Sequence, residues 1–274
     1  MAFFRKDDGE CRGRFGLTIA SLGADVVIDL TCYTLDSAVQ LVKALTGAGT
    51  WLVHCGTIWV HGPGVEVPTT EDEPRRPFGE YGCRKAAIER YLMDETRAGR
   101  VAATVLHPGH LVGPGWAPIN PAGNFNVQVF DDLAAGRDVR LPNLGMETLH
   151  HVHVDDVAQA FVLALSQPDA SIGESFHVVS PRAMTLRGYA ERMAEWFGVP
   201  ASLTFLAYDD WRCGVTERDA AITLDHLRHS SNCSLEKASL RLGYTPRYSS
   251  LAAVQESVAW LLERGRMERK ETVS

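Results

Sequence analysis

Long apolar runs, basic clusters and internal repeats are all missing from this sequence. No stretch approaches the roughly 18 apolar residues that a membrane-spanning helix needs. The net charge is −7, and no block of basic residues resembles a polynucleotide patch. The opening MAFFRKDDGE has two aromatic residues followed by charges, which is the pattern of neither a signal peptide nor an anchor. We therefore expect a cytoplasmic protein whose main partner is neither a membrane nor a nucleic acid.

Closely spaced cysteine pairs are missing as well. The six cysteines are scattered, which is typical of reduced thiols in a cytosolic protein. Histidines are more clustered, and His151 and His153 would share one face of a strand. No carboxylate or cysteine completes an obvious ligand set with them, so we predict no metal site.

The composition is that of an ordinary globular protein. The chain has 274 residues, of which 45% are hydrophobic and 22% are charged. This length suits one large α/β domain, or one domain with a smaller lobe, and it can bury a sizeable core.

Apolar strand patterns alternate with helical patterns in the first part of the chain. The stretches 24–33, 50–57 and 101–109 predict buried strands, and the stretch 35–49 between the first two has helical spacing. Such alternation predicts βαβ units and a parallel sheet with helices on both faces. Ligands of such sheets bind at the carboxyl ends of the strands. Here those ends are Thr31-Cys32, Gly56-Thr57 and Pro108-Gly109.

The alternation becomes less regular beyond residue 115. We expect strands at 148–154 and 174–180, and amphipathic helices at 155–167, 185–198, 234–244 and 251–265. These elements predict a mixed region, 116–274, which completes the core and adds a substrate lobe to an incomplete Rossmann-like core at 1–115.

The stretch EYGCRKAAIERYL places Tyr81 and Lys85 four residues apart on a predicted helix, and therefore on one face. A nearby ammonium lowers the pKa of a phenol, so the pair could form a catalytic acid/base. The same spacing is common on solvated helix faces, so on its own it leaves both interpretations open.

Four blocks give this pair a context. They are HCGTIWVHGP, TTEDEPRRPFGEYGCRK, VLHPGHLVGPG and HHVHVDDVAQAFVLAL. Their order and content resemble the extended short-chain dehydrogenase/reductase family, the NAD-dependent epimerase/dehydratases, from about residue 24 to residue 180. This chain carries His61, His107 and His110 where the family usually has tyrosine, arginine and asparagine.

The resemblance implies a doubly wound, Rossmann-like α/β sheet and a role for each matching residue. Tyr81 would be the general acid/base, Thr57 would hold the substrate oxygen, and Lys85 would bind the nicotinamide ribose and depress the pKa of Tyr81. Further cofactor contacts would come from Leu30, Thr31, Cys32, Pro108 and Gly109. Substrate contacts would come from His61, Glu71, His107, His110 and Trp116.

The implied activity is epimerase-, dehydratase- or reductase-like chemistry at a secondary alcohol or ketone. The resemblance places the chain among oxidoreductases or isomerases that use NAD or NADP, and it favours a nucleotide sugar as substrate and a homodimer as the assembly. The sequence leaves the substrate and the choice of dinucleotide open.

The family's glycine-rich turn, Gly-x-x-Gly-x-x-Gly, does not occur in the sequence. GRFGLTI, residues 13–19, has two of the glycines but follows a charged stretch, and we interpret it as the start of a helix. By the family's pattern, the stretch 24–33 matches the fourth strand, and a full first half would need roughly 40 to 70 more residues, since a βαβ unit takes about 30. We therefore expect an N-terminally truncated sheet whose strand at 24–33 becomes an edge.

Three hypotheses remain open at this point. The chain could be a dinucleotide-dependent enzyme whose cofactor half is shortened or supplied elsewhere. It could be a cofactor-independent isomerase, lyase or cyclase that keeps Thr57, Tyr81 and Lys85 for proton transfer. It could also be a non-catalytic binding relic of the fold.

Overall fold

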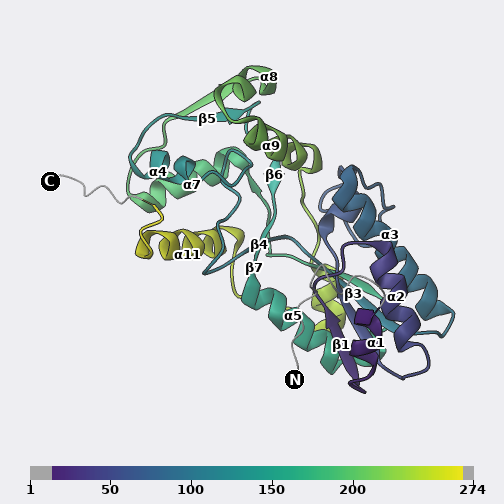
Figure 1. Ribbon diagram of the computed structural model, residues 1–274. Helices are drawn as coiled ribbons and strands as arrows, with labels where there is room; N and C mark the ends of the chain where they lie inside the picture. Colours follow the sequence, from purple (N-terminus) through teal and green to yellow (C-terminus); the bar gives the residue numbers. More distant parts are fainter. Residues whose placement is uncertain (1–13, 268–274) are drawn as a thin grey trace.

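A computed structural model describes residues 14–267 of the chain. Its centre is a four-stranded sheet of order β1-β2-β3-β8 in which every neighbouring pair is parallel. The strands are β1 (Val26–Asp29), β2 (Trp51–Cys55), β3 (Ala102–Pro108) and β8 (Ser175–Val178). Helices lie on both faces of the sheet (Figure 1). The predicted Rossmann-like α/β class is therefore confirmed.

One face of the sheet is covered by three helices from the first part of the chain. They are α1 (Arg14–Ala20), α2 (Leu35–Leu45) and α3 (Gly79–Arg97). The Thr34 side chain caps α2 by accepting a hydrogen bond from the Ser37 amide. Leu41 and Val42 of α2 and Ile88 and Leu92 of α3 are fully buried in one apolar cluster with the sheet. Their helical spacing is what fixes α3 against the strands.

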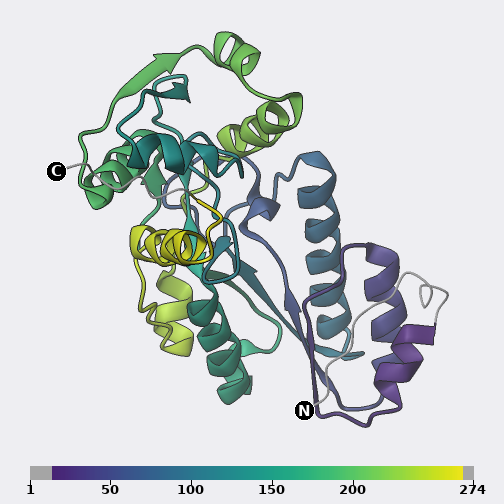
Figure 2. The ribbon, with the colours of Figure 1, turned by 60° about the vertical axis from the view of Figure 1, so that its left-hand side comes forward.

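The opposite face is covered by elements that come much later in the sequence (Figure 2). Helices α5 (Val154–Ser166), α6 (Pro168–Ser171) and α10 (Glu236–Leu242) lie there. Phe161 of α5 and Leu242 of α10 pack in one cluster with Leu106 of β3 and Phe176 of β8. The late part of the chain therefore supplies this layer of the core. The division of the chain at residue 115 stays a prediction.

A second lobe lies beyond the carboxyl ends of the strands. It contains three two-stranded sheets: parallel β5 (Val139–Pro142) with β10 (Leu203–Leu206), parallel β4 (His110–Val112) with β7 (His151–His153), and antiparallel β6 (Thr148–Leu149) with β9 (Met184–Thr185). Its core includes Phe130, Leu141 and Tyr189, all fully buried. The helices of this lobe are α4 (Gln128–Ala134), α7 (Leu186–Phe197), α8 (Tyr208–Trp211), α9 (Glu217–His229) and α11 (Ser250–Glu263), with the short 3₁₀ helix η3 (Arg212–Gly214). A second 3₁₀ helix, η2 (Ile58–His61), follows β2 and packs against α3 in the first lobe.

Across residues 14–267, every helix is too short or too polar to cross a membrane. The predicted helices at 185–198, 234–244 and 251–265 correspond to α7, α10 and α11. Strands β5 and β10 and helix α9 were not predicted.

Strand β1 is an edge of the sheet as far as the described residues show. Its partner on one side is β2, and the side chains of Ile28 and Leu30 are 44% and 55% exposed. Gly16 of GRFGLTI lies in α1, which agrees with the predicted helix start, and Gly13 lies outside the described residues. A Cβ atom at Gly16 would stand 2.9 Å from the Gln40 carbonyl oxygen, so the glycine lets α1 approach α2 closely.

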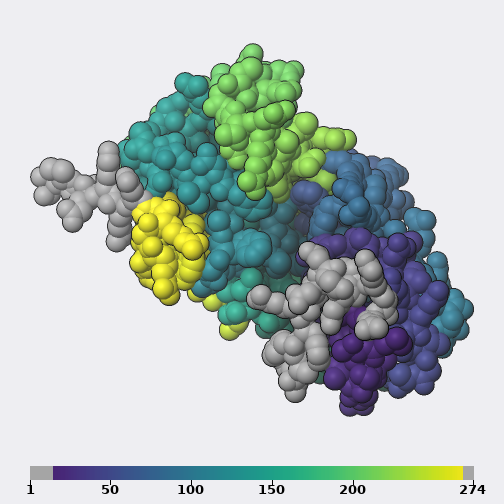
Figure 3. All heavy atoms as spheres, viewed as in Figure 1, coloured from purple at the N-terminus to yellow at the C-terminus, as the bar shows by residue number. Residues whose placement is uncertain are grey.

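Helix α9 joins the second lobe to the first through a stack of rings. The His229 ring lies between the rings of Trp59 and Phe78, with centroid distances of 3.9 and 4.0 Å. The space-filling view shows the green region of α9 against the blue region of α3 (Figure 3). His229 Nδ1 donates to the Asp225 carbonyl at 2.7 Å, and Nε2 is buried without a hydrogen-bond partner among the described residues. Burial therefore lowers the pKa of His229 to about 4.

The edge position of β1 predicts that alanine substitutions of two paired residues, one in β1 and one in β2, lower the free energy of unfolding by different amounts. Ile28 and Val53 are cross-strand partners, but Val53 is fully buried in β2. We expect Val53→Ala to lower the free energy of unfolding by about 2 kcal/mol, because it loses buried apolar area and leaves a cavity. Ile28→Ala should cost about 1 kcal/mol or less. Urea unfolding of both variants measures this, and equal costs would show that β1 is covered.

The buried imidazole of His229 predicts acid sensitivity of the lobe junction. Its folded pKa of about 4 is below the unfolded value of 6.5, so the stability it contributes is present above pH 6.5 and is lost as the pH falls toward 4. His229→Gln should flatten the fall in unfolding free energy over this range by up to about 1.4 kcal/mol per pH unit. Leu227→Ala in the same helix is the control, because it destabilises without removing a titrating group. An unchanged pH slope in His229→Gln would contradict the assignment.

Candidate active site

Three polar side chains meet at the carboxyl ends of β1 and β2. Thr57 follows β2 directly and begins η2, while Tyr81 and Lys85 lie one turn apart in α3. Burial raises the pKa of Tyr81 and hydrogen bonding with the Thr57 side chain opposes the rise, which indicates that these two side chains lie close together. The spacing of the pair in α3 and the packing of α3 on the sheet produce this arrangement.

Lys85 anchors α3 to the two strand ends. The residue is only 2% exposed, and its Nζ donates to the carbonyl oxygens of Cys32 at 2.9 Å and Cys55 at 2.7 Å. The ammonium also lies 4.8 Å from the centroid of the Tyr33 ring. Burial lowers the pKa of Lys85, and the nearby Asp29 carboxylate acts in the opposite direction. The lysine therefore occupies a dry position beside the strand ends.

Tyr81 is accessible and stands in an aromatic frame. Its residue surface is 41% exposed, and its ring lies 5.9 Å from Trp59 and 6.4 Å from Tyr33. Burial around the hydroxyl raises the pKa of Tyr81 to about 12, and the Thr57 side chain opposes that rise. The expectation that Lys85 depresses this pKa is therefore corrected. The ammonium is held by two backbone carbonyls, and desolvation of the phenolate outweighs any attraction.

Thr57 is held from both its side chain and its backbone. Its hydroxyl oxygen accepts a hydrogen bond from the Trp59 amide at 3.3 Å. Its own amide donates to Nδ1 of His107, in the neighbouring strand β3, at 3.1 Å. These contacts fix the turn that directs the Thr57 hydroxyl toward Tyr81.

The residues that the resemblance assigns to cofactor contacts lie at the strand ends, and each has a structural contact of its own. The Asp29 carboxylate accepts hydrogen bonds from the amides of Thr31 and Cys32, each at 3.0 Å, and so shapes the turn after β1. Leu30 in that turn is exposed. Pro108 ends β3, and a Cβ atom at Gly109 would stand 2.4 Å from the His150 carbonyl oxygen. The close approach of the His150 carbonyl is therefore sufficient by itself to require a glycine after Pro108.

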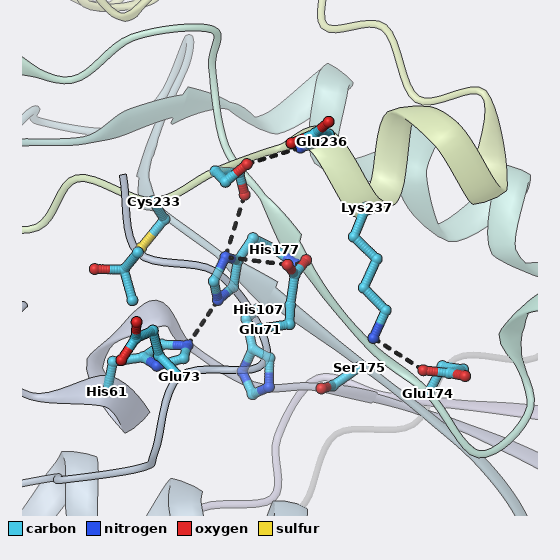
Figure 4. A network of polar contacts seen from close by, with 12 residues as sticks. His61, Glu71, Glu73, His107, Glu174, Ser175, His177, Cys233, Glu236 and Lys237 are labelled. Atoms are coloured by element: carbon cyan, nitrogen blue, oxygen red, sulfur yellow. Dashed lines mark hydrogen bonds and ion pairs between the residues drawn. The ribbon is translucent and has the colours of Figure 1, made fainter. Parts of the chain in front are cut away.

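A buried polar network lies beside these residues (Figure 4). His61 Nε2 is 2.7 Å from His177 Nε2. Because His177 Nδ1 donates to the Ser234 carbonyl at 3.2 Å, its Nε2 accepts from His61. The Glu71 carboxylate accepts from the His177 amide at 2.7 Å, and burial lowers the pKa of His61 to about 3. The network thus pairs most of its polar groups within the fold, while Nδ1 of His61 is buried without a hydrogen-bond partner among the described residues.

The substrate contacts predicted for His61, Glu71 and His107 stay predictions, and the structure gives each of these residues a contact within the fold. All three side chains are buried, and Glu71 is turned inward from a loop whose neighbouring residues Thr70 and Asp72 are exposed. His110 is half-buried, and its Nε2 accepts from the Trp59 indole at 3.3 Å while its ring lies 5.2 Å from His226. Trp116 is 56% exposed. His110 and Trp116 remain predicted substrate contacts.

Several residues of this region were not singled out from the sequence. Glu89 follows Lys85 by four residues on the same face of α3, and Arg75 pairs with it through both guanidinium arms, at 2.9 and 2.6 Å. The spacing from Tyr81 to Lys85 to Glu89 was a readable signal for a shared face. His177, His226 and His229 carried no such signal, because their partners are distant in sequence. Within residues 14–267, no cluster of three or more histidine, cysteine, aspartate or glutamate residues could hold a metal ion.

Comparisons with known proteins show which family this chain resembles. The NAD dependent epimerase/dehydratase family matches residues 30–178. A dTDP-6-deoxy-L-talose 4-dehydrogenase (NAD(P)(+)) of Kitasatospora kifunensis is 29% identical over 210 residues, 75% of this chain and 61% of that protein. A UDP-glucose 4-epimerase of Mycolicibacterium smegmatis is 32% identical over 142 residues, 52% of this chain and 44% of that protein. The chain thus spans less than two thirds of the length of these two relatives.

The fold is shared with a solved structure over nearly the whole chain. The UDP-glucose 4-epimerase of Thermotoga maritima, solved with UDP-glucose, superposes with a TM-score of 0.71 at 21% identity and covers 96% of this chain and 85% of that one. At this identity the likeness speaks for the fold, and the family match over residues 30–178 speaks for kinship. On both grounds, this chain belongs to the NAD-dependent epimerase/dehydratase family.

Proposed function

We propose that this chain takes part in dinucleotide-dependent chemistry at a secondary alcohol or ketone of a nucleotide sugar, with Tyr81 as the acid/base. The observation that carries the proposal is the meeting of Thr57, Tyr81 and Lys85 at the carboxyl ends of β1 and β2, where ligands of parallel sheets bind. The nucleotide-sugar class is supported by the relatives, whose names refer to UDP-glucose and a dTDP-deoxyhexose.

The described residues fit one half of a nicotinamide dinucleotide. An ammonium and a phenol at adjacent strand ends offer donors to ribose hydroxyl groups, which suits Lys85 and Tyr81. The other half lacks its usual cradle, because the sequence contains no Gly-x-x-Gly-x-x-Gly turn for the pyrophosphate. Bound nicotinamide would supply or accept a hydride. NAD and NADP both remain compatible with the residues at β1.

Residues of this chain would donate and accept the proton. A phenol with a pKa of about 12 is protonated at neutral pH, so Tyr81 is ready to donate to a developing alkoxide. Thr57 would hold the same substrate oxygen and keep it in line with the phenol. In the reverse direction Tyr81 must first lose its proton, and a positive charge close to the phenolate would favour that step.

A cofactor-independent acid/base enzyme is the second candidate. A protonated Tyr81 supports it, because such a phenol needs no hydride to transfer its proton. A binding relic is disfavoured, because a relic has no use for a buried lysine held by two carbonyls beside an accessible tyrosine. Location in the cytoplasm and a homodimer are further parts of the proposal.

Dinucleotide binding and a Tyr81 variant test the proposal together. We expect the wild-type chain to enhance the fluorescence of NADH or NADPH and to turn over a UDP- or dTDP-hexose or its 4-keto form. Tyr81→Phe should keep dinucleotide binding and lose about a hundredfold or more in kcat, because it removes the general acid.

Tyr33→Phe is the matched control, since its ring lies beside that of Tyr81 and the proposal assigns its hydroxyl group no part in the chemistry. It should retain wild-type kcat. Turnover that depends on Tyr81 without any dinucleotide binding would support the second candidate. Dinucleotide binding with full activity in Tyr81→Phe would overturn the assigned role.

A further inference from the structure

A chain of buried polar contacts runs from a loop before α3 to the backbone of Thr57. Arg75 donates to both oxygens of Glu89, and Glu89 Oε1 lies 3.1 Å from His107 Nε2. His107 Nδ1 accepts from the Thr57 amide at 3.1 Å. His107 and Glu89 are both buried, so the contacts are shielded from water. This series of contacts therefore ends at Thr57, which lies beside Tyr81.

The last contact fixes the protonation of the His107 ring. A backbone amide can only donate, so His107 Nδ1 carries no proton while it accepts from Thr57. The neutral ring must then carry its proton on Nε2, which faces the Glu89 carboxylate. The Nε2–Oε1 contact is bent and chiefly electrostatic, since Nε2 has no well-aligned hydrogen bond. Burial raises the pKa of Glu89, but the Arg75 guanidinium outweighs that effect and holds the pKa well below its usual range, so Glu89 is an anion that favours the proton on Nε2.

The local sequence makes room for this contact. A Cβ atom at Gly56 would stand 2.4 Å from His107 Nδ1, so any other residue before Thr57 would push the ring away. The Gly56 amide in turn donates to the Leu106 carbonyl at 2.7 Å, which holds β2 and β3 in register there. The turn that carries Thr57 is thus built around the imidazole.

Stability alone does not account for this series of buried contacts. A buried ion pair repays its desolvation poorly, and apolar residues of similar volume often serve a core as well. The contacts instead connect the helix face that carries Tyr81 and Lys85 to Thr57. Glu89 lies on the same face of α3 as Tyr81 and Lys85, and His107 connects that face to Thr57.

We propose that Glu89 and His107 are positioning residues, which hold the Thr57 main chain so that its hydroxyl stays aligned with Tyr81. This inference rests on the proposed function and assigns a role to two residues that touch neither substrate nor cofactor. The His107 imidazole acts as an acceptor for one amide, and Glu89 keeps it in the accepting tautomer. Misplacement of Thr57 by a fraction of an ångström would then slow the chemical step and leave binding unaffected.

Two substitutions of His107 distinguish the effect of its hydrogen-bond acceptor from the effect of its volume. His107→Leu fills the space but offers no acceptor to the Thr57 amide. His107→Asn is smaller, yet its amide oxygen can stand close to the position of Nδ1 and accept the same hydrogen bond. We expect kcat to fall by about a hundredfold in His107→Leu and by less than about tenfold in His107→Asn, with KM and dinucleotide affinity changed by less than about twofold in both.

A merely structural role predicts a different pattern. His107→Asn leaves the larger gap, so it should then be at least as impaired as His107→Leu. Equal kcat in the two variants, or wild-type kcat in His107→Leu, would overturn the inference. Urea unfolding of both variants shows whether any loss of kcat follows from loss of stability.

Nuclear magnetic resonance provides a readout that needs no turnover. With ¹⁵N-labelled histidine, His107 should show its proton on Nε2, and the Thr57 amide should exchange slowly in the wild type and rapidly in His107→Leu. A proton on Nδ1, or unchanged exchange in that variant, would refute the positioning role. If the wild type turns over no nucleotide sugar, the proposed function fails, and these two signals still decide the inference about Thr57.

Discussion

The site depends on one buried ammonium. Lys85 crosses from α3 to the carbonyls of Cys32 and Cys55, and these two hydrogen bonds join the helix to the ends of β1 and β2. A lysine in a dry position is costly unless it is hydrogen-bonded, so these two bonds hold the helix in one place. Tyr81, one turn earlier, is thereby set over the strand ends beside Thr57. Loss of the contact would free the helix face that presents the phenol.

Histidine takes an unusual part in the support of this arrangement. The rings of His61, His107 and His177 lie within the core beside the sheet, while His226 and His229 fill the junction with the second lobe. Neutral imidazole combines an apolar face with one donor and one acceptor, so it can stack on Trp59 or satisfy a backbone amide in the same small space. The consequence is a protein whose interior resists protonation, because burial is the main cause that lowers the pKa of His61 and His229.

The sequence predicted what local periodicity and motif order can carry. The parallel strands and the helix with Tyr81 and Lys85 follow from apolar patterns and spacing. Side-chain direction across distant elements does not, so His107 and Glu71 were expected at the surface of the site and lie buried. Helix α9 was missed because its contacts with Trp59 and Phe78 connect residues far apart in the chain. The pKa of Tyr81 depends on desolvation, which spacing alone does not reveal.

The central claim is that Thr57, Tyr81 and Lys85 form a working acid/base set next to a dinucleotide. The most direct measurement follows deuterium from C4-labelled NADH or NADPH into a 4-keto nucleotide sugar, read by mass spectrometry of the product. The account predicts that the reduced carbon carries the label from the dinucleotide, while the new hydroxyl takes its proton from the protein and solvent. Product that forms without the label, or labelled dinucleotide that is never consumed, would contradict the account.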